Sequence, residues 1–260
     1  MKKTDKTSLL FKLELFSRGK KQVLRLVKDR FLMENKLQLI MTPNPEQIVQ
    51  SRGQDPLNQR FLAALQSADL LIPDGVGLVL ASRFLGQPIQ EKVSGVWLVT
   101  ELLAIAAKRD LKALIIGGKD YDRDHLFSDF KGKNLKDKIE WTPGYQDVTQ
   151  PTREEQLALQ KKLEQLKPDL VFVAFGAPQQ ELWLVENRQL LEENGVKIAM
   201  VVGGSFDFLL GKIKRAPRLL RQLGFEWLFR LIQEPWRWKR QTRLIKFIFL
   251  TLQERKLKQK

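Results

Sequence analysis

Short apolar runs alternate with longer amphipathic stretches along residues 1–211. The runs predict buried strands, and the longer stretches, in which apolar residues recur every three or four positions, predict helices. This alternation indicates an α/β fold, a mostly parallel sheet flanked by helices. The predicted strands are Leu10–Leu15, Leu37–Met41, Leu70–Ile72, Lys112–Ile116, Lys138–Trp141, Leu170–Ala174 and Lys197–Val202. The predicted helices include Gly19–Glu34, Leu57–Ser67, Val96–Lys108, Thr152–Gln165 and Gln180–Asn194.

Several predicted strands end in small or turn-forming residues. Glycine lets the backbone turn sharply and lets a ligand approach it closely. Because ligands of open α/β sheets bind outside the carboxyl ends of the strands, turns of this kind predict one shared crevice. The turns are Pro73-Asp74-Gly75, Gly117-Gly118, Gly176-Ala177-Pro178 and Gly203-Gly204.

Asp74 is the candidate catalytic residue. It follows the apolar run Leu70–Ile72, so the strand delivers its carboxylate to the crevice, and Gly75 and Gly77 then open the next helix. A carboxylate in that position is placed to accept a proton from a substrate. In the alternative interpretation, Asp74 only caps the helix that follows it.

Two further loops carry groups that suit sugar hydroxyls or phosphate oxygens. Thr42 and Asn44 follow the predicted strand Leu37–Met41, in a loop constrained by two prolines. Gln180 and Glu181 lie at a predicted helix N-terminus, where free backbone N–H groups hold phosphate. Both loops have a purely structural alternative. Asn44 and the two prolines would stabilise a turn, and Gln180 and Glu181 would cap the helix that they begin.

The positive charge of the chain is concentrated in residues 212–260. This segment carries +12 of the formal net charge of +15, with 15 basic and 3 acidic residues, and it holds Trp227, Trp236 and Trp238. Cationic and aromatic side chains together favour contact with anionic surfaces. We therefore expect a catalytic α/β domain over residues 1–211 and a basic, aromatic helical appendage over residues 212–260 that docks on an anionic membrane surface.

Several other chemistries are disfavoured by the sequence. Without cysteine, disulfides, thiolate metal sites and a cysteine nucleophile are excluded. The single histidine, His125, lies in a polar stretch, and the Asp-x-Asp patterns within residues 120–124 lack the context of a metal site. The pattern Gly75-x-Gly77 lacks the third glycine of a dinucleotide fingerprint. No metal and no cofactor are therefore predicted.

A transmembrane or secreted protein is also disfavoured. No segment approaches the 18 or more apolar residues that a spanning helix needs. Residues 1–21 contain Lys12, Glu14 and Arg18, where a signal peptide would need an unbroken apolar core. We expect a cytoplasmic protein that is peripheral on the inner face of the cell membrane.

From about Leu37 to Arg240 the chain resembles the bacterial WecG/TagA/CpsF glycosyltransferases. Members of that family transfer N-acetylmannosamine-type sugars from UDP to a lipid-diphosphate-linked sugar. Six motifs in the family's order carry the resemblance. They are TPNPE (42–46), ADLLIPDGVGLV (68–79), EKVSG (91–95), GAPQQE (176–181), VGGSFDFLLGKIKRAP (202–217) and GFEWLFRLIQEPWRWKR (224–240).

The resemblance implies a Rossmann-like body, a UDP-sugar donor and a polyprenyl-diphosphate-linked acceptor in cell-surface polysaccharide or teichoic acid synthesis. It also implies a metal-independent inverting displacement, with Asp74 as catalytic base and with Thr42 and Gln180 near the donor and acceptor. Lys92 stands where the family usually has Arg, so the bidentate grip on a diphosphate is lost. Candidate substrate-binding residues are Asn44, Gly75, Gly77, Lys92, Gly117, Gly118, Gly176, Pro178, Gln180, Glu181, Gly203, Gly204 and Asp207. Candidates for contact with the acceptor diphosphate or the membrane are Arg215, Arg230, Arg237 and Arg240.

Two other functions fit part of the sequence. A basic nucleic-acid-binding protein also presents cations and aromatic rings, but the charge here is confined to one end and no RRM, KH or zinc pattern occurs. No nucleic-acid partner is therefore predicted. A nucleotide-dependent oxidoreductase is disfavoured by the missing third glycine. Self-association into a homo-oligomer through an exposed apolar appendage stays open.

Overall fold

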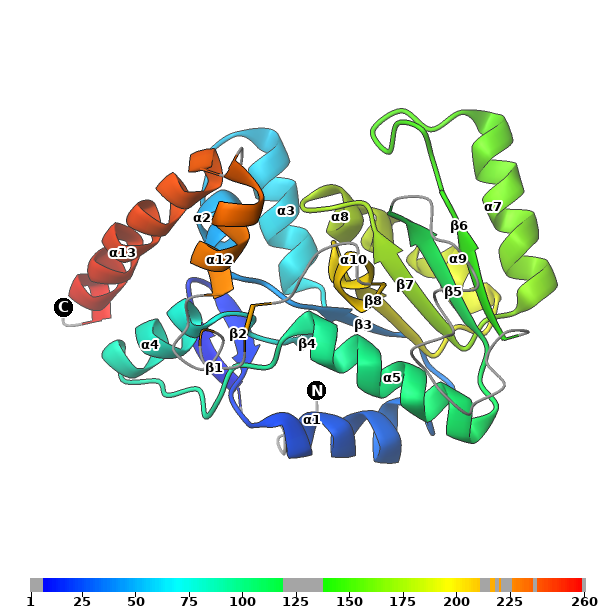
Figure 1. Cartoon of the computed structure of the whole chain (residues 1–260), viewed down its shortest axis with the longest axis horizontal. Coiled ribbons are helices and arrows are strands. Elements are labelled where there is room, and N and C mark those ends of the chain that lie inside the picture. The colour runs from blue at the N-terminus through cyan, green and yellow to red at the C-terminus, as the bar shows by residue number, and fades with distance from the viewer. Residues whose placement is uncertain are drawn as a thin grey trace.

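A central sheet organises the protein, and helices cover both of its faces (Figure 1). The structure, a computed structural model, describes residues 7–118, 138–210, 216–217, 220, 226–235 and 238–258. Within them, eight strands form the sheet in the order β1-β2-β4-β3-β8-β7-β5-β6, and only β1 and β2 pair antiparallel. The predicted α/β fold with a mostly parallel sheet is confirmed. The strands are β1 (Thr7–Leu10), β2 (Leu13–Phe16), β3 (Gln38–Met41), β4 (Leu70–Leu71), β5 (Ala113–Gly117), β6 (Ile139–Thr142), β7 (Leu170–Ala174) and β8 (Ile198–Val201).

The order of the strands brings four loops together at one edge of the sheet. After β3 the chain moves outward to β4, whereas β5, β6 and β7 lie on the other side of β8. β3 and β8 are therefore neighbours, with Ile40 opposite Met200, at a point where the direction of winding changes. Ligands bind at such switch points, outside the carboxyl ends of the strands. The loops that follow β4, β3, β8 and β7 meet there.

Helices pack against the sheet in two groups. α1, η1, α5 and α10 bury side chains against one face, and α2, α3, α4, α7, α8, α9 and α13 against the other. The helices are α1 (Lys20–Leu26), the π-helix η1 (Val27–Phe31), α2 (Pro45–Ser51), α3 (Pro56–Gln66), α4 (Val76–Phe84), α5 (Gly95–Arg109), α7 (Arg153–Leu166), α8 (Gln179–Glu186), α9 (Arg188–Glu193), α10 (Ser205–Leu209), α12 (Glu226–Gln233) and α13 (Trp238–Lys258).

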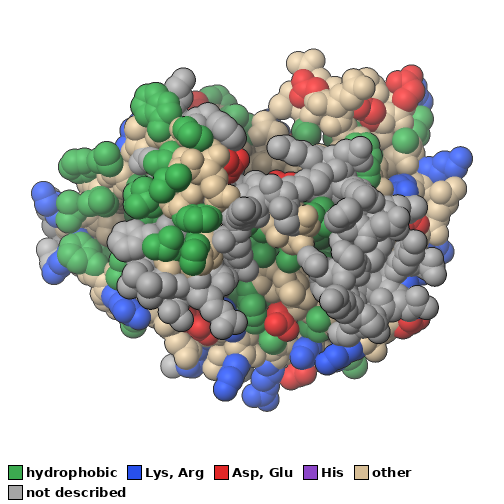
Figure 2. Space-filling view, in the orientation of Figure 1, with side chains coloured by type: hydrophobic (Ala, Val, Ile, Leu, Met, Phe, Trp, Pro, Cys, Tyr) green, Lys and Arg blue, Asp and Glu red, His purple; other side chains and the backbone are tan. Residues whose placement is uncertain are grey.

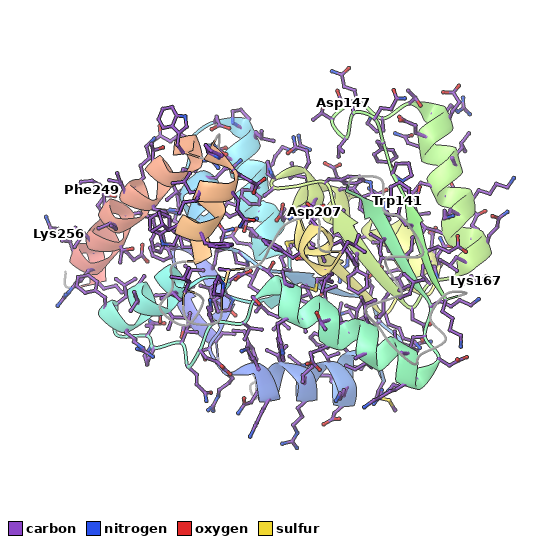
Figure 3. The ribbon with its side chains drawn as sticks, in the orientation of Figure 1. Trp141, Asp147, Lys167, Asp207, Phe249 and Lys256 are labelled. Carbon is purple, nitrogen blue, oxygen red and sulfur yellow. The ribbon has the colours of Figure 1, made fainter. Side chains whose placement is uncertain are left out.

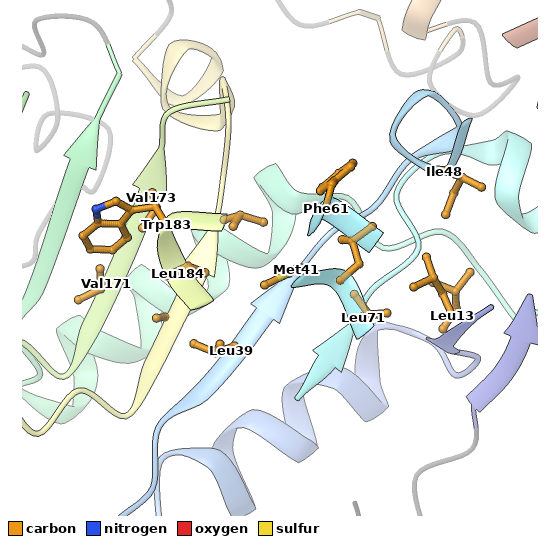
Figure 4. Close-up of a cluster of buried hydrophobic side chains, with 14 of the residues drawn as sticks. Leu13, Leu39, Met41, Ile48, Phe61, Leu71, Val171, Val173, Trp183 and Leu184 are labelled. Carbon is orange, nitrogen blue, oxygen red and sulfur yellow. The ribbon is translucent and has the colours of Figure 1, made fainter. Parts of the chain in front are cut away.

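Both faces of the central strands are buried. Along β7, Val171 and Val173 pack into the core on one face, while Leu170 and Phe172 pack on the other. Figure 4 shows the first of these cores, where Trp183 of α8 lies over β7. Strands that are covered on both faces need apolar residues at every position. This explains why the sequence contains unbroken apolar runs.

The prediction of one strand over Leu10–Leu15 is wrong, because β1 and β2 form a hairpin there. Phe11 and Lys12 make the two-residue turn with φ of 54° and 64°. Positive φ at both central residues gives the twist that joins two antiparallel strands. Glycine or asparagine normally marks such a turn, and neither is present, so the sequence gives no signal for it.

The loop predicted after Asn44 is the helix α2. Asn44 Oδ1 accepts a hydrogen bond from Gln47 N at 3.0 Å, and Gln47 Oε1 accepts one from Asn44 N at 3.0 Å. This reciprocal capping box, with Pro45 as the first helical residue, starts the helix. Asn44 is therefore a helix cap that also faces the crevice described below.

Two predicted helices are divided in the structure. The helix predicted over Gly19–Glu34 consists of α1 and η1, and the one predicted over Gln180–Asn194 breaks at Asn187 into α8 and α9. Asn187 Nδ2 donates to Trp183 O at 2.9 Å. A side chain that bonds to the nearby backbone in this way offers an alternative to a continuing helix.

Within the segment predicted as an appendage, α13 packs on the α/β body. Phe247 is buried, with its ring centroid 5.4 Å from that of Phe11, and Arg243 Nη1 donates to Gln50 Oε1 of α2 at 2.9 Å. Figure 1 shows α13 running alongside α2. Among the described residues, no helix combines the length and apolarity needed to cross a bilayer.

Candidate active site

A cavity of about 990 Å³ opens at the carboxyl ends of β4, β3, β8 and β7. This volume lies at the upper end of the range for small-molecule pockets, roughly 300–1,000 Å³. The cavity therefore has room for a large ligand or for two substrates. The polar and glycine residues of its lining include Thr42, Asn44, Glu46, Gln47, Gln50, Asp74, Lys92, Ser94, Gly95, Gln180, Gly203, Gly204, Ser205, Arg243 and Thr251.

Asp74 lies at the centre of this lining, three residues after β4. Its backbone N–H donates to Pro43 O at 2.9 Å, which ties the loop after β4 to the loop after β3. Gly75 then adopts φ of 105°, a conformation that favours glycine, and α4 begins. Asp74 Oδ2 accepts a hydrogen bond from Gly95 N, the first residue of α5, at 3.1 Å.

Three polar side chains converge around Gly95. The position that a Cβ would occupy on this glycine lies 3.3 Å from Thr42 Oγ1, 3.7 Å from Ser205 Oγ and 3.8 Å from Asp74 Oδ2. The missing side chain therefore leaves room for these groups beside the start of α5. α5 has 15 residues, and the N-terminus of a helix attracts negative charge through its free N–H groups and its dipole. The arrangement is suited to bind an anion beside a carboxylate.

Gln180 holds two of the crevice loops together. Its Oε1 accepts from Gly203 N at 3.0 Å and from Gly176 N at 3.2 Å, and so joins the loops after β8 and β7. Its Nε2 donates to Glu181 Oε1 at 3.0 Å. Gln47 Nε2 donates to the same carboxylate oxygen at 3.1 Å. The hydrogen bond to Glu181 fixes the amide of Gln180 with its oxygen toward the loops.

Glu181 itself is buried beneath the cavity and is only 1% exposed. Burial raises the pKa of its carboxyl from 4.5 to about 7, while the hydrogen bonds from Gln180 and Gln47 oppose the rise. Within the described residues, Glu181 Oε2 has no hydrogen-bond partner. An ionised carboxylate in this position is therefore costly.

Glu181→Gln is expected to remove a pH dependence of stability. Because the folded pKa is raised, the contribution of Glu181 to stability is fully present below pH 4.5 and is lost as pH rises through about 7. Relative to Glu181→Gln, the wild-type chain should lose about 3 kcal/mol across that window. Urea unfolding of both chains at pH 4.5 and pH 8 measures this difference. An equal response of the two chains to pH would contradict the raised pKa.

The structure brings most of the predicted site residues to the cavity. Thr42, Asn44, Asp74 and Lys92 line it. So do Gly75, Gly77, Gly176, Gln180, Gly203 and Gly204.

Five predicted residues do not line the cavity. Gly117 ends β5 and Gly118 follows it, and β7 separates β5 from the central pair of strands. Pro178 precedes α8, Asp207 lies on α10 (Figure 3), and Glu181 lies below the cavity. Arg215 and Arg237 lie outside the described residues, as do residues 120–125 and the side chains of Arg230 and Arg240.

Sequence reasoning missed several lining residues. Ser94 caps α5, and Ser205 follows the glycine pair after β8. Both lie where a strand or helix ends near the crevice, so the sequence pattern could have predicted them. Arg243 had no such signal. It reaches the cavity from α13, far along the chain from the other polar groups.

Comparison with known proteins assigns the family. The sequence matches the glycosyl transferase WecG/TagA/CpsF family over residues 9–260. The chain belongs to this family of glycosyltransferases. Proteins of Bacillus spizizenii and Bacillus subtilis are 31% and 33% identical to it over 230 and 220 residues. The matches cover 87% and 85% of this chain and 83% and 81% of those proteins.

A protein of Staphylococcus aureus strain MRSA252 is 31% identical over 205 residues, which are 79% of this chain and 74% of that protein. All three are named N-acetylglucosaminyldiphosphoundecaprenol N-acetyl-beta-D-mannosaminyltransferase. Membership of the WecG/TagA/CpsF family confirms the predicted resemblance and favours a glycosyltransferase over a nucleic-acid-binding protein or an oxidoreductase.

Proposed function

We propose that this glycosyltransferase moves an N-acetylmannosamine-type sugar from UDP to a polyprenyl-diphosphate-linked N-acetylglucosamine. The names of the relatives support the acceptor and the sugar. The observation that carries the proposal is the convergence of Asp74, Thr42 and Ser205 at the start of α5. One carboxylate beside a helix N-terminus supplies a base and an anion site in a single cavity.

Asp74 acts as the general base. Its carboxylate takes the proton from the acceptor hydroxyl while the hydroxyl oxygen attacks the anomeric carbon. The bond between that carbon and the UDP oxygen breaks, and its electron pair leaves with UDP. A single displacement of this kind inverts the anomeric configuration. Thr42 and Ser205 lie within reach of the same space and orient sugar hydroxyls.

The leaving diphosphate gains negative charge in the transition state. Fixed N–H groups and cations that face this charge lower the barrier. The first turn of α5 and Lys92 line the cavity on the side of Asp74, and Arg243 lines it from α13. We assign the donor diphosphate to the N-terminus of α5 and Lys92.

A membrane surface is the second partner that we propose. Lys246 and Lys256 are exposed on α13, together with Ile245 and Phe249, which are 59% and 63% exposed. Figure 3 shows Phe249 and Lys256 pointing away from the body. Apolar side chains enter a membrane interface, and each nearby basic residue adds roughly 1 kcal/mol on anionic lipid. This arrangement supports our proposal that the protein binds peripherally, on the inner face of the cell membrane.

The decisive test is a transfer assay. The full chain is incubated with a polyprenyl-diphosphate-linked N-acetylglucosamine and with each of a panel of UDP-sugars in turn. Mass spectrometry of the lipid product should reveal one added N-acetylhexosamine, with UDP-N-acetylmannosamine as the preferred donor. Binding of UDP but not of NAD is expected in the same preparation. The proposal is wrong if no UDP-sugar supports transfer to this acceptor by an enzyme that remains folded.

Lys92→Arg is expected to lower the KM for the donor about threefold, and Lys92→Met to raise it about tenfold. Arginine grips a diphosphate with two parallel hydrogen bonds, whereas lysine offers a point charge. Initial rates over a range of donor concentrations measure both changes. Lys108→Met, an exposed lysine at the far end of α5, serves as the control. An unchanged donor KM in Lys92→Met would remove Lys92 from the donor site.

A further inference from the structure

The cavity has a second wall that is apolar. Leu80 and Phe84 of α4 face it from one side, and Phe247, Ile248 and Leu252 of α13 from the other. Within that lining, Leu80 is 58% exposed and Ile248 is 59% exposed. Figure 2 shows hydrophobic side chains gathered on the surface where α12 and α13 lie. Large apolar side chains thus stay uncovered in a cavity that also contains Asp74.

The two helices form a groove that leads away from the catalytic carboxylate. Val76 at the start of α4 lines the cavity, and so do Gly77, Leu80, Ala81 and Phe84, whose spacing of three and four keeps them on one face. This face starts within one turn of Asp74 and extends for about 10 Å at 1.5 Å per residue. The lining residues of α13 repeat every four positions. They are Arg243, Leu244, Phe247, Ile248, Thr251 and Leu252.

Cationic groups lie at both ends of the groove. Near the polar end, Arg243 lines the cavity and donates to Gln50. At the other end, the guanidinium of Arg255 lies 4.1 Å from the centroid of the Phe84 ring. The order along the groove is therefore cation, apolar wall, cation. This order fits a ligand with an anionic head and a hydrocarbon chain that continues toward anionic lipid.

We propose that the groove between α4 and α13 binds the first isoprenoid units of the acceptor, with Arg243 beside its diphosphate. The inference rests on the proposed function and adds a subsite for the hydrocarbon chain. The groove is continuous with the space around Asp74, so an acceptor whose hydroxyl reaches that carboxylate has its chain directed along α4. The relatives' names specify a diphosphoundecaprenol acceptor, which carries such a chain.

A different face of α13 is available for the membrane. Ile245 and Phe249 are as exposed as Ile248, yet they do not line the cavity. They lie one position after Leu244 and Ile248, about 100° further around the helix. Groove residues and outward residues of similar chemistry can therefore be changed separately, which allows a matched comparison.

The test uses diphosphate-linked N-acetylglucosamine acceptors with C5, C10 and C20 prenyl chains in solution, below the concentration at which they aggregate. For the wild-type chain, KM should fall about tenfold from the C5 to the C20 acceptor. The groove variant, Leu80→Gln with Ile248→Gln, should lose this dependence, so that its KM for the C20 acceptor rises about tenfold. Calorimetric binding of geranylgeranyl diphosphate should weaken by a similar factor.

The matched variant, Ile245→Gln with Phe249→Gln, should keep the dependence on chain length and bind liposomes more weakly. If KM does not vary with chain length in the wild-type chain, or varies equally in both variants, the groove does not bind the chain. The wild-type chain could also be a dimer that the groove variant alone dissociates. If the KM of that variant still falls with chain length, the apolar wall binds a second copy of the protein and not the prenyl chain. If no acceptor is used at any chain length, the proposed function itself fails.

Discussion

Asp74→Asn is expected to lower kcat for sugar transfer about a thousandfold, with little change in the KM for the donor. A positioned general base contributes roughly 10²–10⁴-fold to rate, and the amide of asparagine cannot take up a proton. Asparagine keeps the shape of the side chain and an oxygen that can accept from Gly95 N, now at 3.1 Å from Asp74 Oδ2. Steady-state rates with saturating donor and acceptor measure the loss.

Asp55→Asn provides the control for this experiment. Asp55 caps α3 by accepting from Asn58 N at 3.0 Å, and asparagine caps a helix about equally well. Its kcat and melting temperature should match those of the wild-type chain. The role of Asp74 as base is wrong if Asp74→Asn retains near-normal turnover while binding both substrates.

A chain that ends at Gly211 should lose binding to anionic liposomes and at least about a hundredfold of its turnover. The truncation removes α13, which supplies Arg243, Phe247 and Ile248 to the cavity. Removing basic residues also removes roughly 1 kcal/mol of membrane attraction for each one near the surface. Liposome sedimentation and single-turnover rates measure the two losses. Because Phe247 is buried, circular dichroism must establish that the shortened chain is folded.

A full-length variant separates two roles of α13, its contact with the membrane and its contribution to the cavity lining. Lys246→Glu with Lys256→Glu changes two exposed residues of α13 that do not line the cavity. Loss of the two cations should weaken liposome binding about thirtyfold, and repulsion of the two added carboxylates by anionic lipid should weaken it further. Turnover of a short-chain, soluble acceptor should stay at the wild-type level.

For the chain that ends at Gly211, the contradicting outcome is full turnover by a folded protein. That result would exclude any part for α13 in the active site.

Much of the sheet could be predicted because its strands are buried on both faces. An unbroken apolar run such as Leu170–Ala174 has few other interpretations, and β7 has those bounds. Four turns were predicted to share a crevice. Those after β4, β7 and β8 do line one cavity, together with the loop after β3, whereas Gly117-Gly118 does not. The order of the strands was not predicted. Gly117 and Gly118 were therefore grouped with the site although β7 intervenes.

The parts that could not be predicted depend on contacts between distant segments. Nothing around Leu80 indicates that α13 lies opposite α4, and Arg243 resembles the other basic residues near it in the sequence. Glu181 was expected to contact substrate because it lies at a predicted helix N-terminus. Its neighbour Gln180 does line the cavity, but Glu181 is buried. Successive helical residues point about 100° apart, so one can line a cavity while the next is buried beneath it.

The contact between Phe11 and Phe247 has a consequence for synthesis of the chain. Domains generally fold from the N-terminus as they emerge from the ribosome. The β1–β2 hairpin emerges early, but Phe247, whose ring contacts that of Phe11, emerges only with α13. Until then the core around Phe11, which is fully buried in the finished protein, lacks one of its aromatic rings. A chaperone that binds exposed apolar segments should stay associated with nascent chains until α13 is released.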